Sequence, residues 1–411
     1  MSSEPIPPIS SAMPPVEAPH GRLVAMLILT AGTFVVGTGE FAIMGMLPEF
    51  AESLRLSASS AGYAITAYAI GVVIGAPLIT ILGARLSRRE LLLLLFLLFA
   101  FGNILCVSLS SPSAVMAARF VTGLPHGAIF GISALVAASM AERKKRGQAV
   151  GQVLSGIAIS TLIGAPLATF TANHASWRVS YLVIGLLGLC IFAGVWFCIP
   201  ADWPNRKNSP LREIAVMRNV QVMLTLLTAA IGFGGMFGIY TYLTTVLVEV
   251  THVPEWEVMG FMVAWGVAML SGTNFGAWLA DRSINFAALL SLSGSAVAMV
   301  MFPFVLHNQF ALLVDMLAIA VFVNGLGPAL QTRLMDFAGD AQTLAASLNH
   351  SAFNIANALG ASMGSFLLAR HFGYGALGQG GALLSLGGIA VFLCALLLLK
   401  RSGQSEVRTD I

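Results

Sequence analysis

Twelve long apolar runs follow one another along this chain of 411 residues. A helix of about twenty apolar residues crosses the hydrocarbon layer of a membrane, and each run is close to or above that length. Charged residues make up 9% of the chain, whereas about 25% is usual in soluble domains, so a soluble globule is excluded. The sequence therefore predicts an all-α integral membrane protein with twelve transmembrane helices, near residues 23–47, 58–82, 91–110, 114–139, 147–171, 178–199, 219–248, 257–280, 286–306, 310–332, 343–369 and 376–399.

The lysines and arginines are distributed unevenly between these runs. With the N-terminus in the cytoplasm, 17 of them fall in the inside segments and three in the outside segments, while Arg119 lies within the fourth run. This asymmetry follows the positive-inside rule and predicts that both termini are cytoplasmic. The proline- and serine-rich N-terminus lacks the basic-then-apolar order of a signal peptide, so we expect a disordered cytoplasmic tail there.

The chain divides into two similar halves. The segment FVTGL at residues 120–124 matches FVNGL at residues 322–326, and two further matches lie at nearly the same offset, which ranges from 196 to 202 residues. A near-constant offset indicates a duplicated six-helix unit, an architecture in which transporters place their site between the halves. The predicted organisation is an N-terminal tail (1–22), an N-terminal six-helix bundle (23–199), a cytoplasmic linker (200–218), a C-terminal six-helix bundle (219–399) and a C-terminal tail (400–411).

Four short motifs accompany this pattern. Residues 80–89, TILGARLSRR, join the second and third runs, and residues 278–282, WLADR, join the eighth and ninth. The fourth run contains RFVTG at residues 119–123, and the fifth contains Gly156 followed by GAP at residues 164–166. With the twelve runs, these motifs resemble the major facilitator superfamily, in its drug:proton antiporter branch with twelve spans, nearest the AraJ-like and sugar-efflux members. The resemblance covers nearly the whole chain and implies the major facilitator fold, two pseudo-symmetric six-helix bundles.

The resemblance also implies roles for motif residues. In the family, the cytoplasmic loops latch the two halves together. Ala84 stands where the first of these loops usually has an aspartate, whereas the second half keeps Asp281. The residues expected to act in gating are Arg85, Arg88, Arg89, Asp281, Arg282, Gly156, Gly164 and Pro166.

Glu40 lies inside the first apolar run, in the segment GTGEF. A rise of 1.5 Å per residue places it about 12 Å below Pro48, and places Arg119 at a comparable depth of about 10 Å in the fourth run. By resemblance, both helices line the central cavity. A permanent ion pair that braces the N-terminal half is one interpretation. A carboxylate that takes up and releases the transported proton, coupled to Arg119, is the interpretation we favour, because no other acid of this half lies within a span.

Asp315 is the acid of the second half that we expect to be buried, and it is the third candidate for proton coupling. Its helical neighbours Ala318, Ile319 and Phe322 are apolar. A local brace or a residue that reaches toward the membrane surface is an equally good interpretation.

Polar faces on the fourth and eleventh spans and aromatic residues on the seventh predict the wall of a substrate cavity. For the aromatic residues of the seventh span, packing in the core is an equally good interpretation. Thr122 and His126 share a face with Arg119 in the fourth run, and a polar face in a membrane should contact protein or water. In the eleventh run, three polar residues share one face, and hydrogen bonds between helices are the alternative to contact with a substrate. The expected cavity residues are Thr122, His126, Tyr240, His350, Asn354 and Asn357.

The sequence contains no phosphate-binding loop of the GxxxxGK[ST] type and no segment long enough for an ATP-hydrolysing domain. We therefore expect gradient-driven transport: proton-coupled export of small organic molecules, drug-like or sugar-like, by alternating access. A proton-coupled uptake symporter is the alternative, and a membrane sensor without transport is a third. We expect no enzyme activity, no cofactor, no metal and no nucleic-acid partner, because the sequence shows no convergent nucleophile, no metal-ligand spacing and no long basic run with interleaved aromatic residues. The expected setting is a monomer in the bilayer of a bacterial inner membrane, with small-molecule substrate and protons as ligands.

Overall fold

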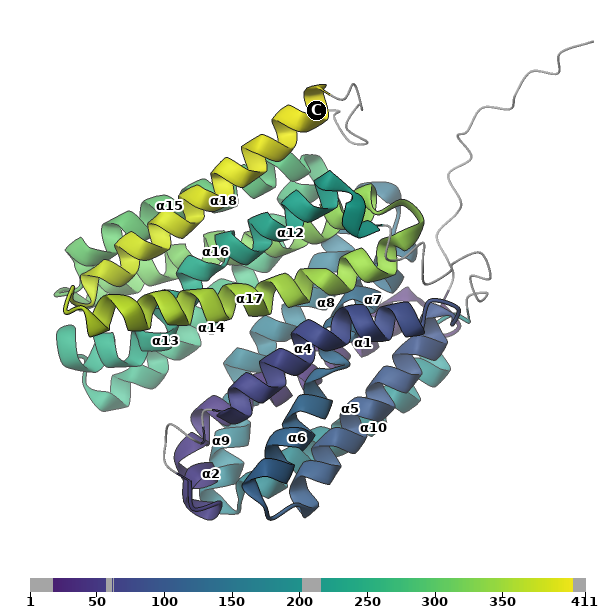
Figure 1. Ribbon diagram of the computed structural model, residues 1–411, viewed down its shortest axis with the longest axis horizontal. Coiled ribbons are helices and arrows are strands. Elements are labelled where there is room, and N and C mark those ends of the chain that lie inside the picture. The colour runs from purple at the N-terminus through teal and green to yellow at the C-terminus, as the bar shows by residue number, and fades with distance from the viewer. Residues whose placement is uncertain (1–17, 57–60, 62, 202–215, 402–411) are drawn as a thin grey trace, which may run out of the picture.

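The computed structural model describes residues 18–56, 61, 63–201 and 216–401 (Figure 1). Within these residues, 12 helical segments are long and apolar enough to cross a membrane, which confirms the predicted number and type of spans. The predicted linker and the two predicted tails lie largely outside the described residues. The spans are Arg22–Met44, Tyr63–Leu82, Arg88–Ser108, Pro112–Ser139, Arg146–Ala172, Trp177–Cys198, Val220–Leu243, Trp256–Arg282, Ile284–Val305, Gln309–Phe337, Gln342–Ala369 and Gly375–Arg401.

Several spans consist of more than one helical element. The N-terminal half contains α1 (Arg22–Gly45), α2 (Leu47–Ser53), α4 (Tyr63–Leu82), α5 (Arg88–Ser108), α6 (Pro112–Gly123), α7 (His126–Ser139), η1 (Arg143–Lys145), α8 (Arg146–Ile159), η2 (Ser160–Gly164), α9 (Ala165–His174) and α10 (Trp177–Cys198). The C-terminal half contains η3 (Val216–Arg218), α12 (Val220–Gly232), α13 (Gly234–Thr245), η4 (Val246–Val250), α14 (Glu255–Arg282), α15 (Ile284–Val305), α16 (Gln309–Phe337), η5 (Gly339–Ala341), α17 (Gln342–Ala369) and α18 (Gly375–Arg401).

Polar side chains define where many of these helices begin. At the start of α5, the Ser87 hydroxyl accepts a hydrogen bond from the Glu90 backbone N–H, while the Glu90 carboxylate accepts one from the Ser87 backbone N–H. This reciprocal pair satisfies two donors that the helix itself leaves unpaired, and such a cap contributes about 1 kcal/mol. Single caps of the same kind begin α6, α10, α12, α15 and α16, at Ser111, Ser176, Asn219, Ser283 and Asn308.

Each half encloses its own apolar core. Phe96, Phe99 and Phe130 are fully buried in the core of the N-terminal half. Phe302 and Phe392 are fully buried in that of the C-terminal half. In Figure 1 the two halves form separate groups of helices, purple to blue and teal to yellow, and α17 packs against α4 and α7 where the groups meet. Most of the buried apolar residues therefore belong to one of two cores, one in each half.

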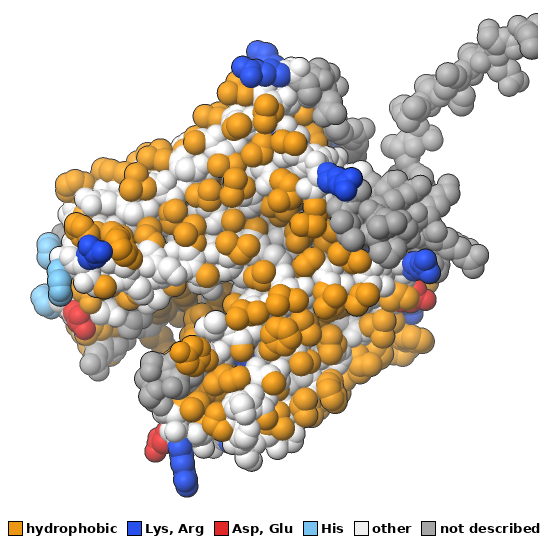
Figure 2. Space-filling model, in the orientation of Figure 1, with side chains coloured by type: hydrophobic (Ala, Val, Ile, Leu, Met, Phe, Trp, Pro, Cys, Tyr) orange, Lys and Arg blue, Asp and Glu red, His pale blue; other side chains and the backbone are white. Residues whose placement is uncertain are grey.

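The bundle has two chemically different ends. The basic end contains the start of α1, the loops at 83–87, 140–145 and 338–341, the start of α12 and the end of α18. The distal end contains α2 and the loops at 109–111, 175–176, 251–254, 306–308 and 370–374. Figure 2 shows that hydrophobic side chains cover the body of the molecule on the face in view, while charged and histidine side chains lie toward its extremities.

The halves contact each other closely toward the basic end. There α7 packs on α17 and α8 packs on α14. A Cβ atom added to Gly131 of α7 would lie 2.5 Å from the backbone nitrogen of Ser347 in α17, so only glycine permits this approach. The structure is therefore closed at the basic end.

Three spans that the sequence predicts as continuous are interrupted. The fourth span is broken between Gly123 and His126, because Pro125 has no N–H for the helical ladder. The fifth contains the π-helical turn η2, and the seventh is broken at Phe233, between two glycines. Interrupted helices at membrane depth usually surround a binding site, and η2, α9, α13 and His126 all belong to the site described next.

Candidate functional site

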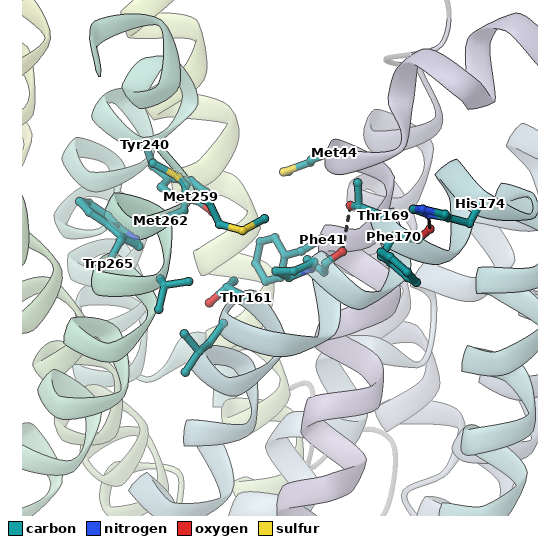
Figure 3. A pocket seen from close by; sticks show the side chains of 14 residues that line it. Phe41, Met44, Thr161, Thr169, Phe170, His174, Tyr240, Met259, Met262 and Trp265 are labelled. Atoms are coloured by element: carbon teal, nitrogen blue, oxygen red, sulfur yellow. Dashed lines mark hydrogen bonds between the residues drawn. The ribbon is translucent and has the colours of Figure 1, made fainter. Parts of the chain in front are cut away.

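A cavity of about 470 Å³ lies between the halves toward the distal end. Figure 3 shows Phe41, Thr169 and Phe170 on one side and Tyr240 and Trp265 on the other. The first side is formed by α1, η2 and α9, and the second by α13 and α14. Because its walls come from both halves, the cavity must change shape when the halves move.

The cavity wall is mainly aromatic and thioether. Tyr240 stacks on Trp265, with ring centroids 5.4 Å apart and an angle of 26° between the rings. The described residues that line the cavity include no Asp, Glu, Lys or Arg, and the Nδ1 of His174 forms a 2.8 Å hydrogen bond with the Phe170 carbonyl. Pockets of about 300–1,000 Å³ suit drug-sized molecules. Three methionines complete the aromatic lining: Met44, Met259 and Met262.

Glu40 directly precedes Phe41 of the cavity wall and is itself buried, with 6% of its surface exposed. Its Oε2 lies 3.8 Å from Nε2 of His126, the first residue of α7. Arg119 of α6 reaches the same turn of α1, where its Nη1 donates a 3.0 Å hydrogen bond to the Gly39 carbonyl. Both Glu40 and Arg119 belong to the described chain, and no ion pair joins them within 4.0 Å. The two charges are neighbours at one depth, but the acid's nearest basic group is His126.

Arg119 is held by aromatic rings. Its guanidinium carbon lies 4.4 Å from the centre of the Tyr68 ring and 5.0 Å from that of Tyr181. Only 1% of its surface is exposed. Cation–π contacts are stronger where water is excluded, so the two tyrosines stabilise the buried charge without neutralising it.

His126 connects this group to the other half. Its Nδ1 shares a 2.8 Å hydrogen bond with the Tyr68 hydroxyl, and its ring stacks on Phe130 at 4.7 Å. Its ring centre lies 5.8 Å from that of His350, in α17 of the C-terminal half. Tyr68, Arg119, Glu40 and His126 thus form one buried cluster in the N-terminal half, which we call the Glu40 cluster, and it ends at the seam between the halves.

His350 faces this seam. Its ring lies 4.3 Å from Phe130, and neither ring nitrogen has a hydrogen-bond partner within the described residues. The amide of Asn354 donates to the His350 carbonyl of the same helix at 3.1 Å, while its Oδ1 has no described partner. Unpaired buried polar groups are costly, so this face of α17 is better suited to a conformation in which water or a ligand reaches it.

Three predicted site residues lie elsewhere. The Thr122 hydroxyl donates to the Ala118 carbonyl at 2.7 Å, and Thr122 packs on Gly102 of α5 inside the N-terminal half. Asn357 is half-buried and is not among the residues that line the cavity. Asp315 lies on a groove formed by α15 and α16, also away from the cavity. Of the predicted cavity residues, Tyr240 lines the cavity, and His126 and His350 meet at the seam.

The predicted latch residue Asp281 bridges the halves at the basic end. Its carboxylate, at the end of α14, accepts hydrogen bonds from the backbone N–H groups of Gly147 (2.6 Å) and Gln148 (3.0 Å) in the first turn of α8. A carboxylate at a helix N-terminus is favoured both by hydrogen bonding and by the helix dipole. Because α8 and α14 belong to different halves, these bonds exist only while the basic end is closed.

Two basic residues near the latch, Arg89 and Arg282, contact tryptophans of their own half. Arg89 donates to the Trp196 carbonyl, and its guanidinium lies 5.3 Å from the Trp196 ring centre. Arg282 lies over the Trp278 ring, 3.4 Å from its centre. Arg85 is exposed in the loop that follows α4, and Arg88 begins α5.

The predicted motif of the fifth span allows α1 to approach closely. A Cβ atom on Gly156 would meet the Thr33 hydroxyl and the Thr30 carbonyl, and one on Gly164 would meet the Thr38 hydroxyl. Pro166 follows the π-helical turn η2, in the first turn of α9, and lines the cavity. The motif therefore positions α1, and Glu40 with it, against the fifth span.

Sequence reasoning missed most of the cavity wall and both tyrosines that surround Arg119. Tyr68 and Tyr181 are polar-tipped aromatics within spans, and that signal would have indicated them as partners for a buried charge. Phe41, Met44 and Trp265 carry no comparable signal, because in sequence they are indistinguishable from residues that pack a core.

Comparisons with known proteins agree with this architecture. A model described as the Major Facilitator Superfamily matches residues 29–361. The chain is 35% identical over 368 residues to "Inner membrane transport protein YdhP" of Escherichia coli strain K12, covering 90% of this chain and 94% of that protein. It is 29% identical over 370 residues to "Putative transporter AraJ" of the same strain, with 90% and 94% covered. Among solved structures, the proton:xylose symporter XylE bound to 6-bromo-6-deoxy-D-glucose superposes with a TM-score of 0.74 at 17% identity, over 92% of this chain and 95% of that chain.

Proposed function

The chain belongs to the Major Facilitator Superfamily and is a multi-pass membrane transport protein, and from this premise we propose that it exports small organic molecules in exchange for protons. The basic end lies in the cytoplasm on this proposal, following the positive-inside rule, and the distal end faces outward. The structure then corresponds to an outward-facing state, with the cavity toward the outside and the latch closed.

The observation that carries the proposal is the position of the Glu40 cluster. Glu40 adjoins the cavity through Phe41, and its partner His126 contacts His350 of the other half. A proton that binds at Glu40 or His126 therefore changes the charge at the seam along which the halves must separate. Coupling between two ligands requires such a group, one whose surroundings differ between the two states.

The exchange cycle follows from this arrangement. In the outward-facing state, a proton from outside neutralises Glu40 and weakens its attraction to His126. The halves then rock, the latch at Asp281 opens and His350 becomes accessible from the cytoplasm. Substrate that binds from the cytoplasm displaces the proton toward that side, and the loaded carrier returns. Arg119 stays between Tyr68 and Tyr181 throughout the cycle, at the turn of α1 that carries Glu40.

The lining of the cavity points to amphipathic, aromatic-containing substrates. Tyr240, Trp265 and Phe170 offer stacking surfaces, and the methionines adapt to ligands of different shape. Hydroxyl-rich sugars need several convergent hydrogen-bond groups, whereas Thr161, Thr169 and His174 are the principal polar side chains of this wall. This observation favours drug-like over sugar-like compounds.

Transport into liposomes tests the proposal and separates it from uptake symport. Purified protein is reconstituted into vesicles with an acidic interior, and a panel of labelled aromatic amines, aromatic acids, neutral antibiotics and sugars is added outside. An antiporter accumulates its substrate inside as protons leave, whichever way the protein is inserted. A symporter accumulates substrate only when the exterior is the acidic side. Equal accumulation of substrate with the acidic side inside and with the acidic side outside would exclude proton coupling.

A further inference from the structure

A second concave site lies on the outer surface of the C-terminal half. It is a groove of about 660 Å³ between α15 and α16. Its rim is strongly exposed: Val297, Phe310 and Val314 have 64%, 75% and 51% of their surfaces free. Apolar side chains exposed on a membrane span face lipid, so the groove opens into the bilayer and not into the cavity between the halves.

Asp315 lies in this apolar groove. Only 8% of its surface is exposed, and its Oδ2 has no hydrogen-bond partner within the described residues. It follows Gln309, the first residue of α16, by six positions, which places it about 9 Å along the helix. A carboxylate at that depth requires a proton or a cation, and the described part of the chain places no basic group within ion-pair distance of it.

The position of Asp315 argues against a part in the exchange cycle. The residues that line the groove all belong to α15 and α16 of one half. Rocking of the two halves leaves the surroundings of such a group unchanged. A proton at Asp315 therefore has no direct means of sensing which side of the membrane is open.

We propose that the groove binds a lipophilic amine that has partitioned into the bilayer. Its ammonium group pairs with the Asp315 carboxylate, and its apolar body lies along Val297, Val314 and Phe322. Charge complementarity selects a cation, since Asp315 is the one acid among the residues that line the groove, its Oδ2 has no described partner, and the other lining residues are apolar except for Ser293 and Gly294. An ion pair in a site without water is far stronger than at a surface, and the volume is that of a drug-sized ligand. The site is distinct from the transport cavity and stands whether or not the transport proposal does.

Photolabelling tests this site directly. The probe is dodecylamine with a diazirine on its terminal carbon, applied to the full chain in nanodiscs of phosphatidylcholine, and dodecanol with the same diazirine is the matched neutral control. We expect saturable labelling of peptides within residues 293–322 by the amine, competed by unlabelled dodecylamine, and only unsaturable labelling by the alcohol.

The isosteric variant Asp315→Asn should lower this labelling by at least about tenfold, because it removes one partner of a buried charge pair, and Asp315→Glu should restore part of it. Equal labelling by amine and alcohol in the unmodified protein would overturn the proposal and leave a groove filled by any acyl chain. Undiminished labelling of a folded Asp315→Asn protein would also overturn it. The comparison of amine with alcohol needs no variant, so it decides the question even if Asp315→Asn fails to fold.

Discussion

Replacing Asp281 by alanine should release the latch at the basic end. The carboxylate accepts two hydrogen bonds from the first turn of α8, at 2.6 Å from Gly147 N and 3.0 Å from Gln148 N. Hydrogen bonds to charged groups contribute about 1.5–3 kcal/mol each when buried, and this site is partly exposed, so we take about 2–3 kcal/mol for the pair. Since about 1.4 kcal/mol corresponds to a tenfold change in an equilibrium constant, Asp281→Ala should shift the balance away from the closed basic end roughly 30- to 150-fold.

Distances across the distal opening measure this shift. Spin labels on cysteines at Glu52 of α2 and Trp256 of α14, both exposed at the distal end, report the separation of the halves in a background without the native cysteines. Pulsed electron paramagnetic resonance in nanodiscs should show one long distance for the parent protein. Asp281→Ala should add a population at shorter distance, because the distal end closes as the basic end opens.

Ser283→Ala is the matched control for the latch. Its hydroxyl caps α15 in the same loop, and the hydrogen bond that it accepts from the Phe286 N–H, at 3.3 Å, lies within one half. It should lower the free energy of unfolding by about 1 kcal/mol and leave the distance distribution unchanged. If Asp281→Ala and Ser283→Ala gave the same distribution of spin-label distances, the assignment of Asp281 as a latch would be refuted.

Three further predictions follow from the packing. Single cysteines placed at Met44 and at His350, in a background without the native cysteines, should react with a water-borne thiol reagent at different rates. The cysteine at Met44 lines the open cavity and should react quickly, whereas the one at the buried position His350 should react only after the latch is released. Equal rates at the two positions would contradict a closed seam. Gly156→Ala should lower the free energy of unfolding by about 1–3 kcal/mol, because the added methyl group clashes with α1. A Cβ atom at Gly260 meets nothing within 4 Å, so Gly260→Ala should leave the free energy of unfolding unchanged or raise it. Similar melting temperatures for the two variants would argue against close packing of α1. Burial raises the pKa of Glu49 at the distal end, so the contribution of this carboxyl to the free energy of unfolding falls as pH rises from the unfolded pKa through the folded one. Glu49→Gln should therefore reduce the pH dependence of the melting temperature over that range. A melting temperature with the same pH dependence as in the parent protein would contradict this prediction.

The number of spans and their approximate positions could be predicted from the sequence, because hydrocarbon thickness and charge leave few alternatives. The end of the tenth span was predicted wrongly. The span was expected to stop at residue 332, which leaves Arg333 in a loop, but α16 continues to Phe337 and Arg333 is buried. Its guanidinium donates to Asn285 Oδ1 at 2.9 Å and to Gln221 Oε1 at 3.0 Å. Those partners come from α15 and α12, and no local pattern reveals them.

The candidate site could be predicted only in part, for a similar reason. Glu40, Arg119 and His126 stand out because a polar group within a span is costly, and the structure gathers all three. Which partner each side chain contacts depends on how the helices are rotated and how they cross. The sequence therefore does not reveal that Glu40 lies within ion-pair distance of His126 and farther from Arg119. Asp315 stands out equally in sequence, yet it lies on the groove between α15 and α16, away from the cavity between the halves.

Substrate accumulation by Glu40→Gln tests the central claim most directly. In liposomes with an acidic interior, the parent protein should accumulate a substrate identified by the panel above. Glu40→Gln should fail to accumulate it while still exchanging labelled for unlabelled substrate without a gradient, because the substitution removes the proton site and keeps the cavity. Glu49→Gln, an acid-to-amide change outside the Glu40 cluster, should accumulate substrate normally. Accumulation by Glu40→Gln at the parent level would contradict the role of Glu40 in proton exchange.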